Sequence, residues 1–180
     1  MSFAIARRTL IAAAVTLVPL AALAHGPVRQ KLEEKIEINA PPAKVWAIIG
    51  NFQDMSWLPG VAKTEGTDGN TPDKAKRKLT LSSGGVIEEA LEKYDAEAMT
   101  LKYRIEKVDV KVLPVNDYAS TIKVTPGDGG KSVVEWKGAY YRGYMNNDPP
   151  AELNEDAANK AVGGIYKAGL AALKAKAEGK

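Results

Sequence analysis

A succession of extended segments, separated by short polar turns, occupies residues 61–144 and limits the folds open to this chain. Apolar and polar residues alternate along these segments, and the connections are rich in Gly, Ser and Asp, as at residues 82–85 and 126–130. Short turns of this kind join antiparallel neighbours in a sheet. We therefore expect consecutive strands at residues 61–65, 76–81, 86–94, 99–106, 112–124 and 133–141.

The segments on either side of this sheet have different patterns. Residues 31–39 alternate and predict one more strand. A short helix is expected to begin at Pro41 and Pro42 and to stop near Gly50, and residues 54–60 should form a turn or a second short helix.

The C-terminal segment predicts a long helix. Asp148 is the expected cap, ahead of Pro149 and Pro150, and apolar residues then recur at helical spacing. Glycine within a helix is unfavourable. The glycines of this helix, Gly163, Gly164 and Gly169, are therefore expected to allow close packing or to leave space.

Residues 1–24 have the parts of a cleaved export signal, with adjacent arginines, an apolar run and Ala22-Leu23-Ala24 before the cleavage point. The apolar run is interrupted by Pro19 and is shorter than the ~20 residues of a transmembrane helix. We expect cleavage after Ala24, one mature domain of residues 25–180 in the periplasm, and no stable membrane span. We expect the general secretory route, with twin-arginine export as the alternative.

Composition removes several functional classes. Lys and Arg number 25 against 22 acidic residues, and Arg7 and Arg8 belong to the signal, so no basic surplus remains for nucleic acid. The chain has no cysteine and a single histidine, His25. Disulfides, thiolate metal sites, Cys nucleophiles and a Ser-His-Asp triad away from residue 25 are therefore excluded. We expect no bound metal and no cofactor.

One strand, two short helices, six strands and a long helix is an order that resembles the START-like, Bet v 1-like superfamily, also called SRPBCC or polyketide cyclase/dehydrase-like. This resemblance implies an α+β helix-grip fold, in which a curved seven-stranded antiparallel sheet and a long C-terminal helix enclose a cavity. The segments that carry the resemblance are residues 36–46, 57–61, 84–91, 101–105, 134–138 and 166–174.

A narrower resemblance rests on the export signal and on residues 51–57 (Asn-Phe-Gln-Asp-Met-Ser-Trp) and 112–118 (Val-Leu-Pro-Val-Asn-Asp-Tyr). These features are similar to the MxaD group, the periplasmic accessory proteins of bacterial methanol oxidation. The resemblance implies that the partners are methanol dehydrogenase and its cytochrome c.

Alternation along the strands identifies the side chains expected on the concave face of the sheet. Residues after the first helix and on the long helix are expected to close the mouth and one wall. A mostly apolar hollow with a few polar groups suits a small hydrophobic ligand, although plain core packing is the alternative for each side chain. The predicted cavity residues are Trp57, Leu58, Ile87, Glu89, Leu91, Tyr103, Tyr118, Trp136, Tyr140, Val162 and Tyr166.

Glu89 differs from the other predicted cavity residues because it carries a charge. A buried carboxylate requires an ion pair or hydrogen bonds. The alternatives to a free cavity carboxylate are a buried pair with Arg142 or Arg104, or a register in which Glu88 points inward.

Three functional classes remain. The MxaD resemblance favours an accessory protein that assists methanol dehydrogenase and its electron transfer to cytochrome c, with no catalytic residues of its own. The alternatives are a carrier of a lipid or quinone-like molecule, or a cyclase or dehydratase that uses Glu89 and tyrosines as acid and base. Position 58, where many similar sequences carry histidine, is Leu58, which disfavours the enzyme.

Overall fold

The computed structural model describes residues 26–180. The predicted signal peptide, its cleavage point after Ala24 and His25 lie outside the described residues. Within residues 26–180, no helix is long and apolar enough to cross a membrane.

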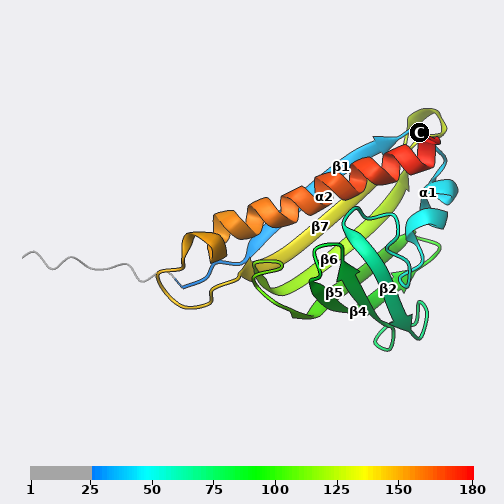
Figure 1. Ribbon diagram of the computed structural model, residues 1–180. Helices are drawn as coiled ribbons and strands as arrows, with labels where there is room; N and C mark the ends of the chain where they lie inside the picture. The colour runs from blue at the N-terminus through cyan, green and yellow to red at the C-terminus, as the bar shows by residue number, and fades with distance from the viewer. Residues whose placement is uncertain (1–25) are drawn as a thin grey trace, which may run out of the picture.

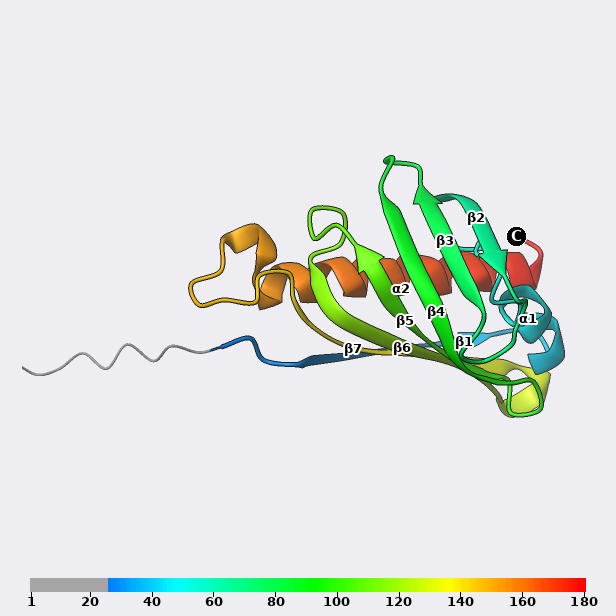
Figure 2. The same cartoon turned by 90° about the horizontal axis from the view of Figure 1, so that it is seen from below.

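A single antiparallel sheet of seven strands, in the order β1-β7-β6-β5-β4-β3-β2, forms one layer, and helix α2 packs against its β1 and β7 end (Figures 1 and 2). All seven predicted strands are present, and the predicted fold class is confirmed. The strands are β1 (Gln30–Ile38), β2 (Val61–Thr67), β3 (Lys76–Leu81), β4 (Val86–Asp95), β5 (Thr100–Val108), β6 (Val115–Pro126) and β7 (Ser132–Arg142).

Strand β1 shows how sequence alternation becomes structure. Its even-numbered residues from Leu32 to Ile38 turn towards the core, and the intervening charged residues are exposed. The strand pairs with β7, with Ile36 opposite Val134, so the first and last strands are neighbours. Burial of one face gives both strands a defined register, because a shift of one residue would exchange the two faces.

One short helix, not two, follows β1. Helix α1 spans Pro42–Ile49, as predicted, but the described residues 51–60 form turns. The side chains of Asn51 and Asp54 accept hydrogen bonds from the backbone N–H groups of Gln53 and Ser56. These local bonds compete with helical bonding, and they explain why the second helix does not form.

Helix α2 spans Glu155–Glu178, and its start corrects the predicted cap. Asn154 is the cap, since its side chain accepts a hydrogen bond of 2.9 Å from the backbone N–H of Ala157. Asp148 instead lies in the preceding loop with a φ of 55°, and Ala151–Leu153 form a short 3-10 turn. Both residue types favour caps, so the position at which the helix meets the sheet decides between them.

Bulges bend the central strands. The register of β4 against β5 shifts between Glu88 and Glu89, and β6 against β7 shifts between Asn116 and Ala119. Figure 2 shows the strong bend along β6. Residues 112–114 were predicted to begin a strand, but they form a turn ahead of β6 that Asp109 stabilises by accepting hydrogen bonds from Lys111 and Val112. This turn reaches the open side of the sheet.

Candidate functional site

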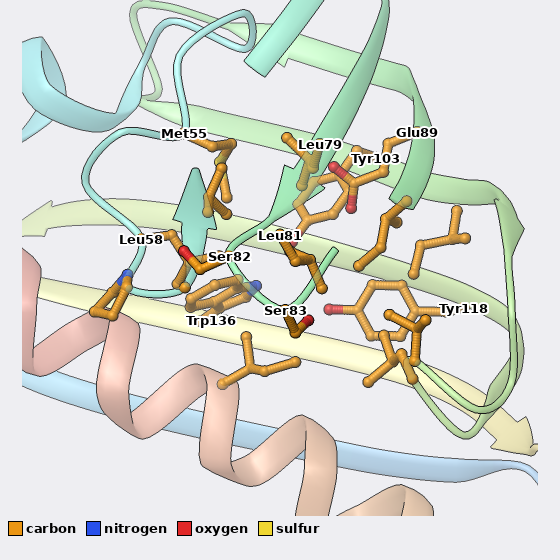
Figure 3. A pocket seen from close by; sticks show the side chains of 18 residues that line it. Met55, Leu58, Leu79, Leu81, Ser82, Ser83, Glu89, Tyr103, Tyr118 and Trp136 are labelled. Carbon is orange, nitrogen blue, oxygen red and sulfur yellow. The ribbon is translucent and has the colours of Figure 1, made fainter. Parts of the chain in front are cut away.

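A cavity of about 480 Å³ lies between the concave face of the sheet and helix α2 (Figure 3). Its walls are mostly aliphatic and aromatic, and its exposed lining residues are Pro59, Gly60, Ser82 and Ser83. The lining residues are Met55, Leu58, Pro59, Gly60, Val61, Leu79, Leu81, Ser82, Ser83, Ile87, Glu89, Tyr103, Ile105, Val112, Leu113, Tyr118, Trp136 and Ile165.

Residues on the five neighbouring strands β3 to β7 supply nearly half of this lining, and where a strand gives two residues they are two positions apart, as the period of a strand requires. Strand β3 contributes Leu79 and Leu81, and β4 contributes Ile87 and Glu89. The turns at residues 55–61, 82–83 and 112–113 close the sides. The curved sheet, these turns and Ile165 of α2 therefore enclose the cavity together.

Six of the predicted cavity residues line this space, and they belong to four different strands and the turn after α1. These are Leu58, Ile87, Glu89, Tyr103, Tyr118 and Trp136. The other five, Trp57, Leu91, Tyr140, Val162 and Tyr166, are buried in the core and do not line it.

The orientation of helix α2 about its own axis explains why the two predicted residues on this helix, Val162 and Tyr166, do not line the cavity. Ile165 faces the cavity, whereas Tyr166 is fully buried against the sheet and stacks on Trp136 with ring centroids 4.3 Å apart. Trp57 also packs against Trp136, with ring centroids 5.6 Å apart. A Cβ atom at Gly169 would lie 2.8 Å from Trp136, so this glycine allows the close packing that the sequence predicted.

Gly164 behaves differently, since a Cβ atom there would meet no atom within 4 Å. Gly138 on β7 is a further close approach, because its Cβ would collide with the hydroxyl of Tyr166. The absence of a side chain at Gly138 thus makes room for a hydroxyl group between the sheet and α2.

Glu89 is buried, with 5% of its surface exposed, and its partner is Arg77 rather than Arg142 or Arg104. Arg77 and Glu89 are directly opposite on β3 and β4, and Arg77 Nε donates to Glu89 Oε2 at 2.5 Å. Burial raises the pKa of Glu89, and the charge and hydrogen bond of Arg77 oppose that rise.

Arg142 and Arg104, the two arginines that the sequence suggested as partners of Glu89, make other interactions. Arg142 pairs with Glu155 at 2.7 Å, and Arg104 lies near Glu92 and Glu106 on the exposed face of the sheet. Glu88 points away from the cavity, so the alternative register is also wrong.

The Arg77 guanidinium is held on three sides. Its Nη1 donates to the backbone oxygen of Phe52 at 2.9 Å, and its central carbon lies 4.2 Å from the Phe52 ring centroid and 4.8 Å from that of Tyr103. Aromatic faces attract a cation in a dehydrated site. Arg77 was not among the predicted site residues, although it shares a strand face with Leu79 and Leu81.

A cluster of buried hydroxyl groups extends from Tyr118, which lines the cavity, into the core. The hydroxyls of Tyr118 and Tyr166 are 2.7 Å apart, Tyr166 is 2.9 Å from Ser120 Oγ, and Trp136 Nε1 donates to Ser120 at 2.8 Å. Burial raises the pKa values of Tyr118 and Tyr166, and burial with the Glu89 charge raises the pKa of Tyr103 to about 12. All three phenols therefore keep their protons at neutral pH.

Comparison with known proteins agrees with this architecture. The model of the family "Polyketide cyclase / dehydrase and lipid transport" matches residues 29–178. The solved structure of XoxI from Bacillus cereus is 31% identical, with a TM-score of 0.67, covering 80% of this chain and 92% of that chain.

Two further structures extend the comparison. An uncharacterised protein from Bacillus thuringiensis is 30% identical, with a TM-score of 0.65, covering 81% of this chain and 96% of that chain. Norcoclaurine synthase from Thalictrum flavum, at 18% identity and a TM-score of 0.58, covers 85% of this chain and 92% of its own and shares the fold. A search among curated proteins gives no match. By its sequence over residues 29–178 and by its helix-grip fold, this chain belongs to the polyketide cyclase/dehydrase and lipid transport family.

Proposed function

We propose that this protein binds a small hydrophobic molecule in the cavity below α2. The observation that carries the proposal is a hollow of about 480 Å³ with an almost entirely apolar lining. Ligand sites are typically apolar clefts of ~300–1,000 Å³ with a few placed polar groups, and this cavity has that size and composition. The family's description, which includes lipid transport, supports the same function.

Filling the cavity is expected to weaken binding of the neutral fluorescent probe N-phenyl-1-naphthylamine. Leu81 lies at the partly exposed edge of the cavity, so the larger ring in Leu81→Trp would occupy the space without overpacking the buried core. We expect the dissociation constant from fluorescence titration to rise at least about tenfold, or roughly 1.4 kcal/mol. The matched control is Lys123→Trp, on an exposed position of β6. Equal affinity in both variants would contradict binding at this site.

A more specific role is proposed from the MxaD resemblance: a periplasmic accessory protein that assists methanol dehydrogenase in electron transfer to cytochrome c and has no turnover of its own. The two segments that carry that resemblance, residues 51–57 and 112–118, come together in the fold, and Met55, Leu113 and Tyr118 from them line one cavity. The lining has one carboxylate, Glu89, whose Oε2 pairs with Arg77, and no second carboxylate or histidine to complete an acid–base pair, which supports the absence of turnover.

This role predicts that the protein raises the rate of cytochrome c reduction by methanol dehydrogenase with methanol, measured with purified components. The Glu89→Gln variant is expected to retain the stimulation, since the proposed role involves no proton transfer. An unchanged rate on addition of the protein would contradict the accessory role. Conversion of a small substrate by the protein alone, abolished in Glu89→Gln, would instead assign it to the enzymes.

A further inference from the structure

The directions of the hydrogen bonds in the hydroxyl cluster follow from its geometry. Ser120 Oγ lies 2.7 Å from the backbone oxygen of Lys137, which can only accept, so the single proton of Ser120 is used there. Tyr166 must then donate to Ser120, and Tyr118 must donate to Tyr166. Tyr118 lies at the cavity end of this chain of hydrogen bonds, and its oxygen can accept a further hydrogen bond.

Glu89 presents a second acceptor to the same space. Its Oε2 receives the bond from Arg77, whereas Oε1 receives no hydrogen bond from the described residues 26–180. Figure 3 shows the Glu89 carboxylate and the Tyr118 hydroxyl directed towards the interior of the cavity, with Tyr103 beside Glu89. An acceptor in an apolar enclosure is stabilised by any donor that reaches it.

Tyr103 adds a hydroxyl donor beside Glu89 (Figure 3), and its pKa of about 12 keeps that hydroxyl protonated. A group that both donates and accepts can therefore satisfy the polar part of this cavity, and a hydroxyl does both. A carbonyl accepts only and would leave Glu89 Oε1 without a donor.

Charge restricts the ligand further. The lining contains no Lys, Arg or His. Arg77 is not part of the lining and pairs with Glu89 through Nε, while its buried Nη2 has no hydrogen-bond partner among the described residues. An anionic ligand would face the Glu89 carboxylate with no cationic side chain in the lining to neutralise it, and burial of such a charge is unfavourable.

We propose that the cavity selects a neutral apolar molecule that carries a hydroxyl group, an alcohol or a phenol, and excludes carboxylates such as free fatty acids. The hydroxyl donates to Glu89 Oε1 or to Tyr118 and accepts from Tyr103, while the apolar body lies against Leu79, Leu81 and Ile165. This inference rests on the proposed function and adds the chemical class of the ligand.

Three probes of one ring size test the proposal: 1-naphthol, naphthalene and 1-naphthoate, titrated by calorimetry at neutral pH. We expect 1-naphthol to bind about tenfold more tightly than naphthalene, the effect of one hydrogen bond to a charged acceptor, and naphthoate to bind most weakly. If none of the three binds, the proposed function fails. If the three bind equally, a hydrophobic site exists but the selection for a hydroxyl is wrong.

Two variants connect the selection to particular atoms. Glu89→Gln, which removes the negative charge, is expected to reduce the discrimination against naphthoate, and Tyr118→Phe, which removes an acceptor, to reduce the preference for naphthol over naphthalene several-fold. Tyr141→Phe is the matched control, because Tyr141 contacts Arg29 on the outer face of the sheet. If discrimination in both site variants equals that of the control, Glu89 and Tyr118 do not select the ligand and the proposal is overturned.

Discussion

Replacing Arg77 by methionine is expected to lower the free energy of unfolding by about 3–5 kcal/mol at neutral pH, because the variant leaves the Glu89 carboxylate buried without its counter-charge. The side chains of this pair are only 2% and 6% exposed, so water cannot replace the lost partner. The measurement is the urea unfolding transition followed by tryptophan fluorescence.

The decrease in the free energy of unfolding caused by Arg77→Met should depend on pH in a defined direction. Burial already raises the pKa of Glu89, and removal of Arg77 takes away the charge that opposes this rise. A carboxyl group with a raised pKa in the folded state is protonated there at little cost below its unfolded pKa of ~4.3, and its burial becomes unfavourable as pH rises above that value. The variant should therefore lose less stability near pH 4 than at pH 7 relative to the wild type.

Two further variants separate the missing charge from lost packing. Arg77→Met combined with Glu89→Leu is expected to recover most of the stability, since apolar replacements of a buried ion pair are often neutral or stabilising. Lys63→Met breaks the exposed Lys63–Glu65 pair and should change the stability by less than about 1 kcal/mol. A double variant as unstable as Arg77→Met would show that the unpaired charge is not the cause.

Trp136→Ala is expected to produce a loss of similar size, about 3–5 kcal/mol in the same unfolding measurement. Trp136 is 1% exposed, stacks on Tyr166 with ring centroids 4.3 Å apart, and donates a hydrogen bond to Ser120. Its removal opens a void between the sheet and α2 and breaks that hydrogen bond. The reason for the large effect is that rigid neighbours on both sides cannot collapse into the space.

Trp46→Ala is the matched control, because Trp46 is half-buried on α1 and makes one aromatic contact, with Tyr94 at 5.8 Å. A smaller loss, of about 1–2 kcal/mol, is expected there, in proportion to the apolar area that it buries. Equal losses in the two variants would contradict a central packing role for Trp136.

Part of the cavity wall follows from strand alternation and part does not. Ile87, Glu89 and Tyr103 were predicted to face inward, and the structure places them there, because the side-chain period of two residues is a local property of the backbone. The partner of Glu89 depends on the β3–β4 register. A four-residue turn at residues 82–85 would place Arg77 opposite Ala90.

The observed hairpin differs by one residue. The N–H of Leu81 bonds to the oxygen of Gly85, and Gly84 adopts a φ of 88°, so Arg77 is opposite Glu89 instead. The shift depends on the conformation of the turn, which short sequence patterns do not specify.

The sequence by itself determined the order of the seven strands and of helices α1 and α2, the inward face of each strand and the family, since each depends on local periodicity or on motifs along the chain. Only the tertiary structure decided that Ile165 rather than Tyr166 faces the cavity, that Asn154 rather than Asp148 caps α2, and that Arg77 neutralises Glu89. The physical reason is that helix rotation, helix docking and hairpin register are properties of how elements pack against one another, which residues distant in sequence jointly determine.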